Sequence, residues 1–362
     1  MAVGVTTATR PRTLDLIAKY RNVPGISDLH FVPDRTAFVR ADGDNSERFA
    51  APSLEDVHEF MKLVASPEQL REFNNEGSLT AIRAGYSDEG EGGIGRIRVQ
   101  VKQHYYGLKV AIRYLQNTPP GVAAIDLPET VTQWMHKPSG LVLFCGITGT
   151  GKTTTQASLV HYALSKTNPH VITLENPIEY LYDDDRVTMR ELGRHFRTFD
   201  QGLFDAMADD PDIIMMGEIL NRDTAEAALY AAESGHLVLA TVHTNSTMHA
   251  ADRIVSLFDT GERDMARTVL ALQLIGCVGS KLVKKIGGGR RAAFEVLVKT
   301  PSVAGAIAKG NTKDIRDALT NTRSVGMQSL EQHLRLLASG PEPQITAAEA
   351  KNAAEFPDEV RL

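Results

Sequence analysis

The chain contains little cysteine: only Cys145 and Cys277 occur among its 362 residues, far apart and in apolar surroundings. This excludes a disulfide framework and a zinc site built from cysteines, and it is typical of a reducing compartment. Long hydrophobic runs are also missing, since residues 140–147 fall far short of the ~20 residues that span a bilayer. Residues 1–26 lack the continuous apolar segment of a signal peptide. We therefore expect a cytoplasmic protein without a transmembrane segment.

An excess of basic charge is absent as well. Lys and Arg total 39 against 45 Asp and Glu, which leaves a net charge of −6. Such a chain is a poor candidate for passive electrostatic attraction to nucleic acid, so we expect no stable nucleic-acid binding, although a local basic face stays open. The hydrophobic content of 42% and the charged content of 23% are globular values and exclude general disorder. At ~150 residues per domain, the length predicts two domains.

The first third of the chain has the pattern of a small α+β domain. Residues 36–43 predict a strand that enters a turn, and the apolar positions of 54–64 recur at the spacing of an amphipathic helix. Alternation of apolar and polar residues over 97–114 predicts two half-buried strands of a hairpin. The polar faces of these strands carry Arg98 and Arg113.

A break follows where the chain reads Asn-Thr-Pro-Pro-Gly, which can continue neither a helix nor a central strand. We place the domain boundary there. The expected organisation is an N-terminal domain (1–118), a linker (119–122), a second domain (123–340) and a polar tail (341–362).

The second domain alternates short apolar strands with helical segments. This alternation implies a parallel sheet covered on both faces, so the fold class is α/β. From about Arg267 onward the pattern predicts mainly helix. The expected strands are 140–146, 170–174, 212–216 and 236–242.

A phosphate-binding loop stands out in this domain. Residues 146–153 read Gly-Ile-Thr-Gly-Thr-Gly-Lys-Thr and match G-x-x-x-x-G-K-[ST] in full. Such a loop lets backbone N–H groups converge on phosphate oxygens at the N-terminus of the next helix. Lys152 would reach the β- and γ-phosphates of ATP, and the Thr153 hydroxyl would ligate the Mg²⁺ that bridges them. A glycine turn with an exposed lysine is the structural alternative. The expected nucleotide-binding residues are Gly146, Thr148, Gly149, Thr150, Gly151, Lys152, Thr153 and Thr154.

Hydrolysis also needs groups that position water and metal. Residues 212–218 form an apolar strand that ends in the carboxylate of Glu218, as a Walker B element does, and this carboxylate could hold Mg²⁺ or orient water. Glu175 and Glu179 follow another apolar run, and Glu175 would leave the sheet at the edge where α/β proteins bind ligands. A helix cap for Glu218 and an exposed turn for the glutamate pair are the alternatives.

Taken in order, these segments resemble the hexameric ATPases of the type II and type IV secretion superfamily, the traffic ATPases. Within this family the chain is most similar to pilus-retraction motors and to the DotB/TraJ-type ATPases of type IVB secretion and conjugation. The resemblance covers roughly residues 27–337. Besides the phosphate loop, the matching segments are 27–30, the Asp box 173–180, Walker B 210–218, the His box 233–244, 284–290 and 326–330.

The resemblance implies a PAS-like N-terminal domain and a RecA-like motor domain with a helical C-terminal part. It also implies a homo-oligomer in the form of a six-membered ring, with secretion or pilus platform proteins of the inner membrane as partners. Glu218 would be the Walker B glutamate and Glu175 the Asp-box glutamate that polarises water. His243 would sense the γ-phosphate or couple neighbouring subunits, although an isolated histidine is more often a strand-end residue. Arg98 and Arg113 would swing toward the nucleotide, unless they form a solvated strand face.

The chain departs from the family pattern at two places. Asn176 replaces the usual Asp-box aspartate, and 220–221 lack the Arg-Asp pair expected after Walker B, which occurs at 222–223 instead. A basic cluster could be solvated, could contact the next subunit or could bind DNA. Its members are Lys281, Lys284, Lys285, Arg290 and Arg291.

The leading hypothesis is an ATP-hydrolysing motor in which ring-coupled domain motion acts on an inner-membrane apparatus. The alternatives are a RecA-like nucleic-acid translocase and a weakly hydrolysing, nucleotide-dependent assembly regulator. A small-molecule P-loop kinase is disfavoured because no basic lid segment is evident.

Overall fold

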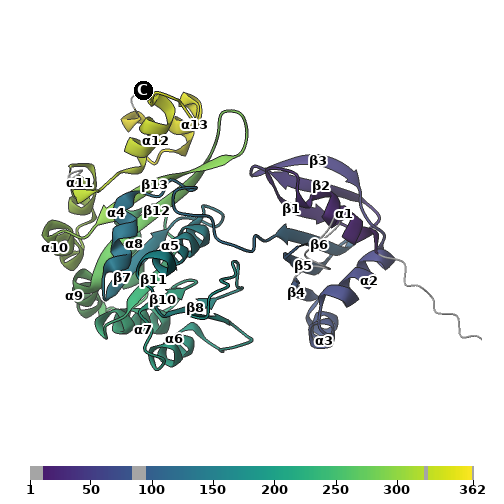
Figure 1. Ribbon diagram of the computed structural model, residues 1–362, viewed down its shortest axis with the longest axis horizontal. Coiled ribbons are helices and arrows are strands. Elements are labelled where there is room, and N and C mark those ends of the chain that lie inside the picture. Colours follow the sequence, from purple (N-terminus) through teal and green to yellow (C-terminus); the bar gives the residue numbers. More distant parts are fainter. Residues whose placement is uncertain (1–10, 84–94, 322–324, 361–362) are drawn as a thin grey trace, which may run out of the picture. The chain divides into compact units, whose positions relative to one another are not determined.

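The fold divides into two units, residues 1–117 and 118–362 (Figure 1). The structure is a computed structural model that describes residues 11–83, 95–321 and 325–360.

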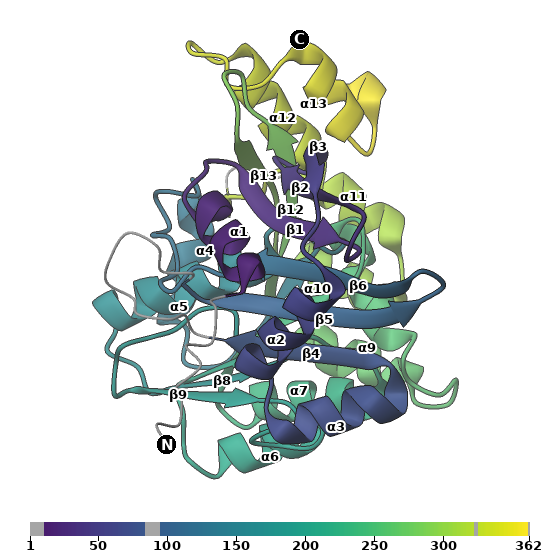
Figure 2. The ribbon, with the colours of Figure 1, turned by 90° about the vertical axis from the view of Figure 1, so that its right-hand side faces the viewer.

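An antiparallel sheet of six strands, in the order β3-β2-β1-β6-β5-β4, forms the first unit. Three helices accompany it, and in Figure 2 α1 and α2 lie in front of the sheet. The elements are α1 Arg12–Arg21, β1 Ile26–Phe31, β2 Thr36–Ala41, β3 Asp44–Ala50, α2 Leu54–Val64, α3 Pro67–Glu76, β4 Ser78–Arg83, β5 Ile97–His104 and β6 Gly107–Tyr114.

The core of this unit lies between the helices and one face of the sheet. Val57, Met61 and Val64 form the buried stripe of α2 and pack with β5 and β6. The predicted helix at 54–64 and the predicted hairpin at 97–114 are therefore confirmed. Arg96, directly before β5, is 5% exposed, and its guanidinium donates to the Gln116 carbonyl.

The second unit contains a sheet of seven strands in the order β13-β12-β7-β11-β10-β8-β9. Neighbouring strands from β12 to β9 run parallel, and β13 pairs antiparallel with β12. The predicted parallel α/β sheet is confirmed. The strands are β7 Gly140–Cys145, β8 Val171–Glu175, β9 Val187–Glu191, β10 Ile213–Met216, β11 Leu237–Val242, β12 Leu274–Lys284 and β13 Arg290–Val298.

Helices cover both faces of this sheet, as continuous apolar strands require. One face packs against α5 and the segment that contains Trp134, and the other packs against α6 to α10. The helices are α4 Glu129–Gln133, η1 Trp134–His136, α5 Lys152–Lys166, α6 Phe199–Met207, α7 Arg222–Glu233, η2 Thr247–His249, α8 Ala250–Val255, α9 Arg263–Gln273, α10 Pro301–Lys309, α11 Thr312–Asn321, α12 Leu330–Ser339, α13 Ala347–Ala353 and η4 Pro357–Glu359.

The C-terminal third contains the expected helices, from α9 to α13, together with a hairpin that was not predicted. β12 and β13 form this hairpin, which completes the sheet beside β7. β12 is buried on both faces over most of its length, so it lacks the alternation that marks a half-buried strand. Residues 341–360 are also more than a polar tail, because α13 packs against α12 and β12 and buries Ala350 and Ala353.

Among the described residues, no helix combines the length and the apolar composition needed to cross a membrane.

Candidate functional site

The candidate site lies at the carboxyl edge of the parallel sheet. The register pairs Cys145 of β7 with Val242 of β11, while Met216 of β10 pairs with residues of both β11 and β8. The segments that follow these four neighbouring strands therefore start at one edge, where open α/β sheets bind ligands. The phosphate loop, Glu175, Glu218 and His243 all lie in or directly after these strand ends.

Glycine backbone geometry shapes the phosphate loop. Gly146, Gly149 and Gly151 have φ values of 146°, 83° and 99°, in the region that side chains disfavour. A Cβ on Gly146 would lie 2.3 Å from the Thr150 hydroxyl and 3.1 Å from the Ser280 carbonyl. Gly151 is the N-cap of α5, so the loop ends at the positive end of a 15-residue helix. This arrangement fits the binding of an anionic phosphate.

Lys152 points back into the loop. Its Nζ donates to the carbonyl oxygens of Gly146 at 2.8 Å and Ile147 at 3.0 Å, and the residue is 8% exposed. Burial lowers the pKa of Lys152, and the nearby carboxylate of Glu218 partly offsets this effect. A phosphate oxygen beside the ammonium would stabilise its charge more than the neutral carbonyls do, so the lysine is suited to anion binding.

The threonines of the loop and of the first turn of α5 differ in their partners. The hydroxyl of Thr150 donates to Ile147, and that of Thr154 shares a hydrogen bond with Tyr180 at 2.9 Å. Within residues 11–83, 95–321 and 325–360, the Thr153 hydroxyl has no hydrogen-bond partner. The Thr153 oxygen is therefore the one in this turn that is open to a hard cation such as Mg²⁺.

Glu218 and His243 are in direct contact. His243 Nε2 lies 3.0 Å from Glu218 Oε2, and the two side chains are 41% and 30% exposed, respectively. The Thr241 hydroxyl donates to the Gly217 carbonyl at 2.6 Å, which fixes the end of β10 against β11. Gln156 of α5 donates to the Met216 carbonyl at 3.2 Å. Walker B is thus tied both to the His-box strand and to the helix that follows the phosphate loop.

Glu175 is held more rigidly than Glu218. The carboxylate is 3% exposed and accepts hydrogen bonds from the Thr173 hydroxyl and the Glu179 backbone N–H. It is two residues beyond Thr173 on β8, so it faces the α5 side of the sheet. Glu175 also lies near Tyr182, whose hydroxyl donates to the Ala157 carbonyl of α5; burial and the Glu175 carboxylate raise the pKa of Tyr182. Glu175 is therefore close to the helix that follows the phosphate loop and lies at the edge of the sheet where ligands bind.

Arg98 and Arg113 lie on the sheet of the first unit. They are cross-strand partners in β5 and β6, and Arg113 also lies opposite Asp28 of β1. Arg113 Nε donates to Asp28 Oδ1 at 2.7 Å, and the arginine side chain remains 40% exposed. The fold thus places both arginines together on the sheet face opposite the helices, as the alternation predicted.

The residues at the two family departures have different surroundings. Asn176 directly follows the end of β8. Arg222 forms a bidentate contact with Glu262 and a pair with Glu226, which raises its pKa, so this arginine links α7 to the segment before α9.

The basic cluster is only partly solvated. Lys281 Nζ donates to the Ala353 carbonyl and Arg291 pairs with Asp126 at 2.6 Å, so both act within the second unit. Lys285 and Arg290 are exposed near the turn of the β12–β13 hairpin.

Sequence reasoning missed the residues that support the site. Gln156 lies one helical turn after Lys152, so a polar side chain on the buried face of α5 was the available signal. Tyr180 lies within the Asp-box segment and Thr241 within the His box, where each contributes a hydroxyl to a neighbouring segment.

Comparison with known proteins places these segments in a family context. Residues 95–339 match the family model described as type II/IV secretion system protein. The chain is 33% identical to the type IV pilus retraction ATPase PilT of Pseudomonas aeruginosa, over 92% of this chain and 96% of PilT. It is 34% identical to the type IV pilus ATPase PilU of the same organism, over 75% of this chain and 71% of PilU.

Solved structures show the same likeness. The crystal structure of the pilus retraction motor PilT with bound ADP has a TM-score of 0.80 and 31% identity, and the match covers 96% of this chain and 98% of that one. The Legionella pneumophila ATPase DotB has a TM-score of 0.79 at 23% identity, with 96% of both chains covered, and supports the fold alone.

Proposed function

The chain belongs to the type II/IV secretion system protein family, and from this premise we propose that it is an ATPase that drives a secretion, conjugation or type IV pilus machine. The observation that carries the proposal is the convergence of the phosphate loop, Glu175 and the Glu218–His243 pair at one sheet edge. The reaction is the hydrolysis of ATP to ADP and phosphate. A phosphate loop accounts for binding, and the carboxylates account for attack by water.

The proposed binding residues fall into two groups, one for the phosphates and one for Mg²⁺. The backbone N–H groups of 149–153 and the ammonium of Lys152 would hold the phosphates. Thr153, with Glu218 acting through water, would hold Mg²⁺, which supplies charge neutralisation between the β- and γ-phosphates.

The carboxylates are suited to positioning water. Glu218 is partly exposed and can accept a proton or a hydrogen bond from water, while His243 fixes its orientation. Glu175 is held by the Thr173 hydroxyl and the backbone of Glu179, so its carboxyl oxygens have a fixed position at the same edge. His243 would report the state of the γ-phosphate to the adjoining chain segment.

We further infer a homohexameric ring in which the N-terminal unit, a PAS-like domain, brings Arg98 and Arg113 to the phosphates. An arginine that reaches the transferring phosphoryl group stabilises transition-state charge. Release of phosphate would then let the domains separate and move a platform protein at the inner membrane, where the otherwise cytoplasmic ring associates through its partners.

The proposal is tested by replacing the phosphate-loop lysine. Lys152→Ala should abolish ATP turnover and weaken ATP binding, because the buried ammonium supplies the charge at the phosphates. Phosphate release and binding of a fluorescent ATP analogue measure the two effects. Lys166→Ala, at the other end of α5, is the control and should turn over ATP like the wild type. Turnover by Lys152→Ala equal to wild type would refute the assignment of the loop.

A further inference from the structure

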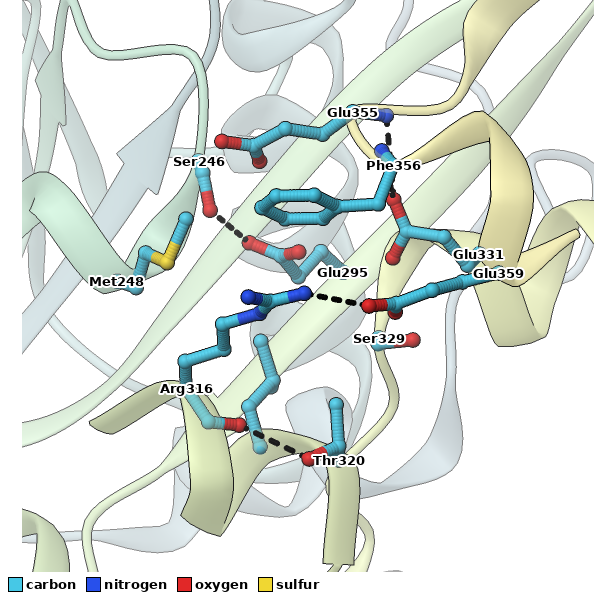
Figure 3. Close-up of a pocket in the computed structure, with 11 residues that line it drawn as sticks. Ser246, Met248, Glu295, Arg316, Thr320, Ser329, Glu331, Glu355, Phe356 and Glu359 are labelled. Atoms are coloured by element: carbon cyan, nitrogen blue, oxygen red, sulfur yellow. Dashed lines mark hydrogen bonds and ion pairs between the residues drawn. The ribbon is translucent and has the colours of Figure 1, made fainter. Parts of the chain in front are cut away.

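A buried glutamate lies close to the His-box segment. Glu295 on β13 is 5% exposed and lines a small pocket (Figure 3). The same pocket is lined by the turn at Ser246, by α11 and α12, and by the C-terminal segment 355–359. No proposed catalytic residue lines it, so Glu295 has no direct part in the reaction described above.

One carboxylate oxygen of Glu295 receives several hydrogen bonds. Its Oε1 accepts from the Ser246 hydroxyl at 2.9 Å, the Thr247 backbone N–H at 2.7 Å and the Thr247 hydroxyl at 2.6 Å. Burial raises the pKa of Glu295, and these donors pull it back toward its ordinary value. A buried carboxyl group is costly, and satisfying it with donors from a single turn makes that turn rigid.

The close approach of the turn depends on a glycine. Gly279 of β12 pairs with Glu295 of β13, and a Cβ there would lie 3.3 Å from Thr247 Cγ2. The absence of a side chain lets the Ser246–Thr247 turn pack directly on the sheet beside the carboxylate.

The turn is connected to the catalytic edge by a short path. It begins three residues after His243, and the Thr244 hydroxyl donates to the Ser246 carbonyl at 3.1 Å. His243 in turn contacts Glu218 at 3.0 Å. Because so few residues separate the Ser246–Thr247 turn from His243, a shift of this turn would also displace His243.

The C-terminal segment closes the other side of the pocket. Glu331 accepts hydrogen bonds from the backbone N–H groups of Glu355 and Phe356, at 3.1 and 3.2 Å. Arg316 pairs with Glu359, and its guanidinium lies 3.9 Å from the ring centroid of Phe356 (Figure 3). Glu331 therefore bonds the C-terminal segment and not the Ser246–Thr247 turn, although both glutamates line the same pocket.

We propose that Glu295 is a positioning residue for ATP hydrolysis, which holds the Ser246–Thr247 turn so that His243 stays against Glu218. The inference rests on the proposed ATPase function and adds a residue that touches neither nucleotide nor water. Its effect is transmitted through His243, and this distinguishes it from a side chain that only stabilises the fold.

The first test compares two glutamates of the same pocket. Glu295→Ala should lower kcat by about 10- to 100-fold while KM for ATP changes little, because displacement of a catalytic group affects the chemical step. Glu295→Gln keeps an acceptor oxygen and should recover most of the activity. Glu331→Ala is the matched control, since Glu331 is equally buried but bonds the C-terminal segment. An equal loss of kcat in Glu331→Ala would overturn the proposal.

The second test is a double-mutant cycle with His243→Ala. If Glu295 acts through His243, Glu295→Ala should lower kcat little further in that background. Equal fold-losses in both backgrounds would overturn the proposal. If circular dichroism shows that Glu295→Ala does not fold, Thr247→Val takes its place in the cycle. This variant removes the Thr247 hydroxyl that donates to Glu295. If the wild type hydrolyses ATP and Glu295→Ala is fully active, only this inference is refuted. If the wild type does not hydrolyse ATP, the proposed function itself is refuted.

Discussion

Glu218 and His243 are predicted catalytic residues that the fold brings into direct contact, 3.0 Å apart at the ends of neighbouring strands. Partial exposure leaves the carboxylate of Glu218 accessible to water. Lys152 is the opposite case, a buried cation that is hydrogen-bonded only to loop carbonyls in the described contacts. In the proposed reaction, the buried ammonium of Lys152 would bind phosphate and the accessible carboxylate of Glu218 would position water.

Glu218→Gln should retain ATP binding and slow hydrolysis by at least about 100-fold, because the amide cannot supply the negative charge that orients metal and water. Single-turnover hydrolysis and equilibrium binding measure the two properties separately. Glu342→Gln, at an exposed position between α12 and α13 and outside the motifs, serves as the control and should match wild type. Complete loss of ATP affinity in Glu218→Gln would indicate a structural role for this carboxylate instead.

His333 predicts a pH dependence of stability. Its Nδ1 accepts a hydrogen bond from the Phe294 backbone N–H, and burial lowers the pKa of His333. The neutral ring therefore contributes stability that is fully present above its unfolded pKa of ~6.5 and is lost as pH falls through the lower folded pKa. Relative to His333→Gln, the wild-type free energy of unfolding should decrease between pH 7 and pH 5, as measured by urea denaturation. A difference independent of pH would contradict this assignment.

At the scale of elements, the motor sheet was largely predictable. β7, β8, β10 and β11 are continuous apolar runs that end in glycine or charged residues, so their burial and the edge they share follow from sequence. The β12–β13 hairpin was not predictable in this way, because the sequence of β12 neither alternates between apolar and polar residues nor consists of apolar residues alone. Its strand state is set by pairing with β7, a contact distant in sequence.

The contacts that support the site could not be predicted from the sequence for the same reason. Glu295 lies 48 residues from Thr247, and nothing in either local segment indicates that they bond. The phosphate loop and the Walker B strand, by contrast, each act within a contiguous motif whose residue types are dictated by the chemistry. Motif residues were therefore found from sequence, whereas the residues that position them required the three-dimensional arrangement.

The tight packing of β12 can be tested at Gly276. A Cβ there would lie 2.5 Å from the Trp134 ring and 2.6 Å from the Leu297 carbonyl. Gly276→Ala should therefore destabilise the second unit by about 1–3 kcal/mol, or more if the backbone cannot shift. Gly305→Ala in α10, where a Cβ meets nothing within 4 Å, should be neutral or stabilise by up to ~1 kcal/mol. Equal unfolding midpoints for the two variants in urea would contradict this packing.

At the scale of the whole molecule, the proposed motor depends on residues from both units. The arginines of the first unit lie on a sheet face next to Asp28, and the phosphate loop belongs to the second unit. Under the proposed function, neither unit alone holds every group assigned to the reaction, so we expect movement of one unit relative to the other to control hydrolysis.

Arg113→Ala should lower ATP turnover more than ATP affinity, because an arginine finger acts on charge that develops in the transition state. The same substitution breaks the pair with Asp28, so Asp28→Asn is the matched control that loses the ion pair and keeps the cation. Steady-state kinetics should show a reduced kcat for Arg113→Ala and a near-normal kcat for Asp28→Asn. Equal losses in both variants would assign Arg113 to domain stability.

Assembly is tested most directly by measuring ATP turnover per chain against protein concentration, with the molar mass determined in the same samples with and without Mg-ATP. We predict that turnover per chain is low while the protein is monomeric and rises in step with a species of about six chains, because in our proposal the arginines reach the phosphates only within the ring. Full activity per chain in a sample whose mass is that of the monomer would contradict the ring motor.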